Sequence, residues 1–178
     1  MTNSKIIPDD PVTLEEAKEY PSFEIFDRSN PAFFQYIKFI ETWGGGNIYP
    51  CVMPLPEGVK SKTGQTRAVV IQYINDPETV EDDHDDGLRG EYWSGQYRPI
   101  AIMNQGDHVL LKVGGNDLGG IYYWTQKRDG LNYTIARVAD DFHSFLDLLY
   151  EDPKIGSTNP WTRMKSVNDS PAVDFVYR

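Results

Sequence analysis

Apolar residues recur with helical spacing in two separate segments of the chain. The first stripe has the i, i+3, i+4, i+7 spacing of a helix with one buried face and consists of Phe33, Tyr36, Ile37 and Ile40. Asn30-Pro31 provides the start of this helix, and the glycines at 44–46 provide its end. The second stripe predicts a helix from about residue 139 to 150 and consists of Phe142, Phe145, Leu146 and Leu149. An earlier, shorter helix is predicted from the capping-box spacing of Thr13 and Glu16.

Between these helices the pattern changes to short runs rich in β-branched and aromatic residues. The runs predict strands at Thr66–Ile74, Tyr97–Met103, His108–Val113, Gly120–Trp124 and Tyr133–Val138. The last four follow one another through short turns, which predicts antiparallel pairing because parallel strands need a long crossover. The chain ends on an alternating segment at 172–177 that predicts an edge strand, and 47–64 reads as a loop with one extended piece.

This order of elements predicts an α+β fold in a single domain. We expect a mainly antiparallel sheet of about five to six strands, flanked by N-terminal helices and one C-terminal helix. The core of the domain is expected at about residues 13–150, and 151–178 would form a C-terminal extension.

The segment from Asn75 to Gly95 interrupts the apolar pattern. Eight acidic residues and one arginine lie between Asp76 and Glu91, and unpaired carboxylates are costly to bury. The prediction is a solvated acidic loop, with a partner-binding surface as the alternative. A calcium site at 81–87 is a weaker alternative, because the ligand spacing of an EF-hand is missing.

Charge and cysteine content restrict the classes of function. The chain has 17 basic and 27 acidic residues, a formal charge of −10, so it would repel nucleic acid and favour a basic partner. Solubility alone is the other explanation of this charge. A single cysteine, Cys51, excludes an internal disulfide, and no apolar run has the length of a membrane span. We expect a cytoplasmic protein without a membrane anchor.

Local spacing offers no catalytic or metal site. The three histidines, His84, His108 and His143, share no ligand spacing, and Cys51 has no neighbouring histidine. The glycine-rich segment 114–120 lacks the phosphate-loop motif and precedes a strand. We therefore expect no enzyme, no cofactor and no metal. A hydrolase that uses the acidic loop and His84 is an alternative that would need those groups to converge in a cleft.

Several short motifs occur in one order along the chain: Pro99-Ile100-Ala101, Gly106-Asp107, Gly120-Ile121-Tyr122-Tyr123-Trp124, and the helix at 139–149. As an ordered set they resemble the SUKH superfamily, also called the Smi/Knr family. The helix before Trp43-Gly44-Gly45-Gly46 resembles the N-terminal helix of that family, although Trp43 stands where the family has asparagine. The acidic segment at 76–91 and the tail after Pro153 also depart from the family pattern.

The resemblance implies a protein that binds other proteins. Bacterial members are immunity proteins that neutralise toxins, including those of contact-dependent inhibition, and eukaryotic members regulate cell-wall synthesis. The first expectation is an immunity protein that occludes the active surface of a cognate toxin, for example a basic one such as a nuclease; the alternative is a regulatory scaffold. The expected contact residues are Asp82, Asp83, Asp85, Asp86, Tyr92 and Trp93. The two aromatic residues would serve as exposed anchors or, alternatively, pack over the sheet edge.

Overall fold

The computed structural model describes residues 4–89, 93–103, 106–127, 132–152, 154 and 173–175. Its helices are α1 (Leu14–Ala17), the 3-10 helix η1 (Pro21–Phe23), α2 (Phe34–Trp43), α3 (Pro77–Arg89) and α4 (Phe142–Asp147). Its strands are β1 (Lys5–Pro8), β2 (Gly46–Tyr49), β3 (Val52–Pro54), β4 (Ala68–Ile74), β5 (Tyr97–Met103), β6 (His108–Lys112), β7 (Ile121–Gln126), β8 (Tyr133–Ala139) and β9 (Val173–Asp174).

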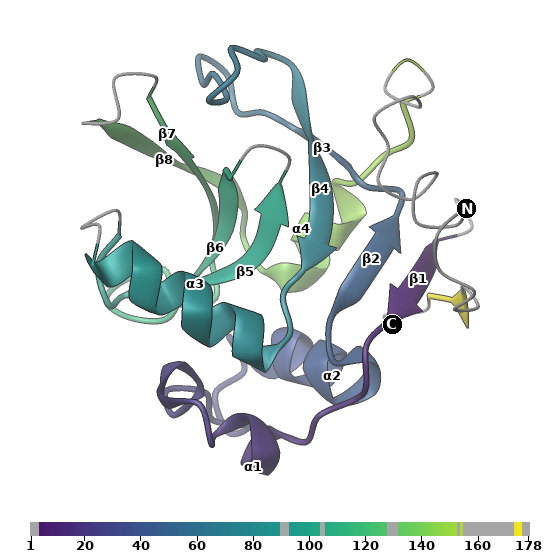
Figure 1. Ribbon diagram of the computed structural model, residues 1–178, viewed down its shortest axis with the longest axis vertical. Coiled ribbons are helices and arrows are strands. Elements are labelled where there is room, and N and C mark those ends of the chain that lie inside the picture. The colour runs from purple at the N-terminus through teal and green to yellow at the C-terminus, as the bar shows by residue number, and fades with distance from the viewer. Residues whose placement is uncertain are drawn as a thin grey trace.

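The strands form a nine-stranded antiparallel sheet with the order β8-β7-β6-β5-β4-β2-β1-β9, and β3 pairs with β4 beside this path (Figure 1). The α+β class and the antiparallel pairing of β5 to β8 are confirmed. The sheet is larger than expected because β1 and β2, of four residues each, are too short to give a clear pattern. Gly46 lets these two strands approach closely, since a Cβ there would be 2.3 Å from the carbonyl oxygen of Ile7.

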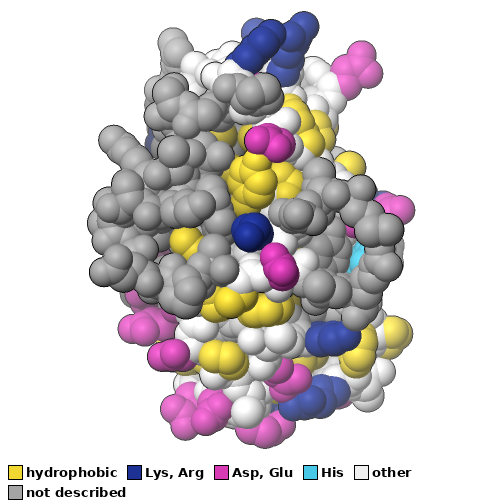
Figure 2. Space-filling view, turned by 90° about the vertical axis from the view of Figure 1, so that its right-hand side faces the viewer, with side chains coloured by type: hydrophobic (Ala, Val, Ile, Leu, Met, Phe, Trp, Pro, Cys, Tyr) yellow, Lys and Arg dark blue, Asp and Glu magenta, His cyan; other side chains and the backbone are white. Residues whose placement is uncertain are grey.

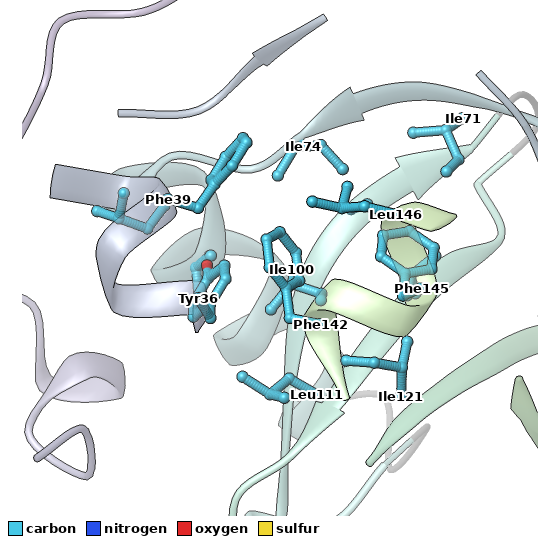
Figure 3. Close-up of a cluster of buried hydrophobic side chains, with 14 of the residues drawn as sticks. Tyr36, Phe39, Ile71, Ile74, Ile100, Leu111, Ile121, Phe142, Phe145 and Leu146 are labelled. Carbon is cyan, nitrogen blue, oxygen red and sulfur yellow. The ribbon is translucent and has the colours of Figure 1, made fainter. Parts of the chain in front are cut away.

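One face of the sheet packs against α2 and α4 (Figure 3). Tyr36 of α2 and Phe142 of α4 meet with their ring centroids 5.3 Å apart, in an edge-to-face arrangement. Alternate residues of the strands point into this core, and they include Ile100, Leu111 and Ile121. The two apolar stripes found in the sequence are therefore the stripes that form the main core.

Helix α3 covers part of the opposite face (Figure 1). Leu110, which lies between the core residues Val109 and Leu111 in β6, points to this second face and packs with Trp93 and Trp124. The expected acidic loop is thus wrong: most of the segment is a helix of 13 residues.

Most predicted helix ends agree with the structure within a few residues. The capping box of Thr13 and Glu16 is present, and Gly44 ends α2 at φ 69°. Helix α2 begins at Phe34, later than expected, because Asn30 closes a turn by accepting a hydrogen bond from the amide of Ala32. Helix α4 is shorter than expected and begins after Asp141, whose carboxylate accepts a hydrogen bond from the Ser144 amide.

The predicted C-terminal edge strand is confirmed as β9, which pairs with β1. It returns Phe175 to the main core, where its ring packs edge-to-face on Phe39 and Trp43. Most of the predicted extension, 155–172, lies outside the described residues. Within the described parts of the chain, no helix combines the length and the apolar character that a bilayer crossing requires.

Candidate protein-binding surface

Helix α3 has a buried face and an acidic face. Val80, His84 and Gly87 are buried at helical spacing against the rest of the fold. Glu78, Asp82 and Asp86, spaced four residues apart, are exposed on the other side, and we call them the acidic face. Asp85 lies half-buried at the margin of this face. Of the six residues expected to bind a partner, Asp82, Asp85 and Asp86 are therefore accessible.

The helix is held in place by polar contacts at its start and in its middle. Asp76 caps it by accepting a hydrogen bond of 2.8 Å from the amide of Thr79. The Glu81 carboxylate accepts a hydrogen bond of 2.7 Å from the amide of Ser22 in η1. The guanidinium of Arg98 in β5 donates to the carbonyl of the same Ser22, also at 2.7 Å. Because one backbone unit of η1 joins both α3 and the sheet, the acidic face has a defined position over the strands.

Asp83 serves the fold itself. Its carboxylate accepts a hydrogen bond of 2.9 Å from the side-chain amide of Asn75, a residue without exposed surface. The imidazole Nε2 of His108 lies 3.4 Å from the same oxygen. Asn75 also donates to the carbonyl oxygen of Pro99 at 3.0 Å, so this group ties the start of α3 to strands β5 and β6.

Trp93 packs over the sheet and is not the exposed anchor that was expected as one of its two possible roles. It is only 4% exposed and meets Trp124 and His108 with ring centroids 5.3 Å away in each case. Gly87 of α3 makes room for the indole, since a Cβ there would be 2.1 Å from two indole carbons. Tyr92 lies outside the described residues.

An acidic cleft opens beside the N-terminal end of α3. Its volume is about 620 Å³. It is lined by Pro8, Asp9, Asp10, Val12, Glu16, Glu19, Tyr20, Asp76, Pro77 and Glu78. Six of these residues carry carboxylates and none is a lysine, arginine or histidine. Figure 2 shows acidic side chains gathered at the end of the molecule where Figure 1 places α1. Glu78 belongs to both the acidic face and this acidic cleft, so the two form one continuous surface.

The carboxylates of this surface are close enough to perturb neighbouring groups. Burial raises the pKa of Asp9; the hydrogen bond from the Tyr73 hydroxyl opposes the rise, and the charges of Asp76 and Asp10 add to it. Burial also raises the pKa of Tyr20, and nearby carboxylates, Glu78 and Asp82 among them, raise it further. A positively charged group placed here would relieve this repulsion.

The other candidate metal-binding and catalytic side chains are not brought together in the described part of the chain. Within the described ranges, no group of three or more His, Cys, Asp or Glu side chains is arranged to hold a metal ion. Burial, followed by the charge of Arg98, lowers the pKa of His84, which faces the interior. Cys51 is buried, and burial raises the pKa of its thiol to about 11. The arrangement is suited to binding a positively charged surface.

The sequence indicated the acidic segment but not its helical structure, and it gave no indication of the acidic cleft. Its carboxylates come from 9–10, 16–19 and 76–78, which only the folded chain brings together. The helical structure of α3 could have been predicted from Asp76-Pro77, because a capping residue followed by proline is a typical helix start, and Asp76 does cap this helix.

The motifs that carried the family resemblance also meet in space. Asp107, in the turn before β6, accepts a hydrogen bond of 2.6 Å from the hydroxyl of Tyr123 in β7. A comparison with curated proteins finds no match for the chain. The model of the SMI1 / KNR4 family (SUKH-1) matches residues 35–148, from α2 through α4. Since that match spans more than half of the sequence, the chain belongs to the SMI1 / KNR4 family (SUKH-1).

Proposed function

We propose that this protein is a cytoplasmic immunity protein that binds a cognate toxin domain and blocks its active surface, without catalysing a reaction. The observation that carries the proposal is the continuous acidic surface formed by the acidic cleft and the acidic face of α3. A toxin that acts on nucleic acid presents a basic surface to its substrate. An acidic surface of this size is complementary to it and would compete with the substrate.

The form of the surface supports a protein partner. A cleft of about 620 Å³ accepts several side chains, and the helical face beside it extends the contact along α3. The contacts of Ser22 with Glu81 and Arg98 hold that helix on the sheet, so little conformational freedom is lost on binding. The net charge of −10 would also accelerate the encounter with a basic partner.

The test uses the product of the gene next to the one that encodes this chain. Purified protein should bind that product in a pulldown and protect cells that co-express it. Replacing Asp82→Asn and Asp86→Asn together should slow association about tenfold at low salt, with a smaller effect at high salt. Glu57→Gln with Asp174→Asn removes the same charge from exposed positions elsewhere and should leave association within about twofold.

Three results would count against the proposal. Failure of the neighbouring product to bind, together with absence of protection, would exclude an immunity role. Binding without protection would instead favour the regulatory scaffold. Equal slowing by the two double variants would show that net charge, and not the acidic surface, governs association.

A further inference from the structure

The two edges of the sheet differ in length and protection. The edge at β9 has two residues, one of them the charged Asp174. The edge at β8 has seven residues, and within the described parts of the chain β8 pairs with β7 alone. Among the described residues no strand covers the outer side of β8, so its backbone groups there can pair with another strand.

Strand β8 has few of the features that usually protect an edge, and those it has lie at its C-terminal end. Its sequence, YTIARVA, contains no proline and no glycine, and its one charged residue is Arg137. The register with β7 is regular from Tyr133 to Arg137 and shifts beyond that point, between Ile121 and Tyr122 on β7. The straight part of the edge is therefore the five-residue segment 133–137, with Ile135 at its centre.

We propose that β8 is a homodimer interface, at which a second copy of this chain pairs its own β8 antiparallel to the first. Centred on Ile135, this pairing places Tyr133 opposite Arg137 of the second copy, and Arg137 opposite Tyr133 of the second copy. Both residues are exposed, and they share one face of the strand with Ile135 because side chains alternate. The proposal is independent of the proposed function.

The segment is complementary to itself in this register. A guanidinium over a tyrosine ring is a favourable cation–π pair, and the two-fold arrangement forms it twice. Ile135 opposite Ile135 adds a β-branched cross-strand pair at the centre. Arg137 lies 3.0 Å from the carboxylate of Asp140, but Arg137 is partly exposed and Asp140 is largely exposed, so this ion pair competes weakly.

A first test measures mass as a function of concentration by sedimentation equilibrium on the full chain. The wild-type mass should move from monomer toward dimer over roughly 1 to 500 μM, as expected for a small interface. Tyr133→Lys sets lysine opposite arginine twice and should weaken the dimer about tenfold. Adding Arg137→Glu to that variant should restore it, whereas Leu118→Lys, at an exposed loop residue, should have no effect.

A second test determines the register of the two paired β8 strands from the disulfides that form between them. Tyr133→Cys and Arg137→Cys chains should form a mixed disulfide when combined, since the proposed register makes these positions direct neighbours. Either variant alone should form no disulfide-linked dimer, because identical positions would lie about 13 Å apart along the strands. Cys51 is buried and should not contribute. A monomer at every concentration, or disulfides between identical positions, would overturn the proposal.

Discussion

The indole of Trp93 lies against the backbone of Gly87, so that a Cβ at position 87 would be 2.1 Å from two of its carbon atoms. A glycine inside a helix normally weakens it, by about 1 kcal/mol relative to alanine. Here the missing side chain lets α3 approach the cluster of Trp93, Leu110 and Trp124 on the second face of the sheet. The position of the acidic face therefore depends on this close contact.

We expect Gly87→Ala to destabilise the protein, although alanine favours the helix. The methyl group has to displace a packed indole, and such overpacking costs about 1 to 3 kcal/mol. Urea unfolding followed by circular dichroism would measure the change in the free energy of unfolding. Gly95→Ala is the matched control, because a Cβ at position 95 would have no atom within 4 Å, and it should be near neutral.

A double-mutant cycle would show that the indole is the cause. In a Trp93→Leu background, the added methyl of Gly87→Ala has less to displace, so its destabilising effect should shrink by at least about 0.5 kcal/mol. An unchanged effect in that background would contradict the explanation.

This contact also shows why α3 was not recognised from the sequence. Local patterns predicted β5 to β8 because each strand is a short run rich in β-branched, aromatic or other apolar residues. Among the described side chains, the buried positions of α3 are instead a proline, a valine, a histidine and a glycine, and glycine is a poor helix former. The burial of Gly87 follows from its contact with Trp93, which lies beyond the end of the helix.

A second prediction concerns the pH dependence of stability at Asp9. Its pKa is raised above 3.8 in the folded protein, chiefly by burial. As the pH rises from below 3.8 through the folded pKa, the unfolded chain releases this proton first, so the contribution of Asp9 to stability falls. Asp9→Asn removes the titration, and its stability relative to wild type should therefore increase over this pH interval in urea unfolding.

Asp141→Asn is a control of opposite sign. Chiefly the hydrogen bond from the Ser144 backbone amide lowers the pKa of Asp141, so the contribution of Asp141 to stability is present above 3.8 and is lost as the pH falls through the folded pKa. This variant should be less stable than wild type at neutral pH and approach it at low pH. Parallel pH profiles for the two variants would contradict both assignments.

The acidic cleft illustrates a second limit of sequence reasoning. Asp9 comes close to Asp76 because β1 pairs with β2, and β2 in turn pairs with β4, directly before Asp76. The first of these pairings depends on a glycine at position 46 that allows backbones to meet. Contacts of this kind join segments more than sixty residues apart and leave no local pattern.

A third prediction tests the role of the C-terminal strand. Phe175 is 6% exposed and packs on Phe39 and Trp43, so Phe175→Ala should reduce the free energy of unfolding by about 3 kcal/mol. Val173→Ala in the same strand is the control, because Val173 is 36% exposed and should cost less than about 1 kcal/mol. Similar values for the two variants would show that the segment pairs with β1 without contributing to the core.

The last prediction uses Cys51 as a reporter of the folded state. Its thiol is 2% exposed, and burial raises its pKa from 9.0 to about 11. Because the thiolate is the reactive form, a rise of two units lowers its fraction at pH 8 roughly a hundredfold before access is considered. Reaction with an aromatic disulfide reagent should thus be at least about a hundredfold slower than in urea-unfolded protein.

A Leu118→Cys variant, which places a thiol at an exposed loop position, should show an additional fast phase. Fast reaction of the native wild-type protein would mean that the β2–β3 region opens readily, since Cys51 lies between these strands.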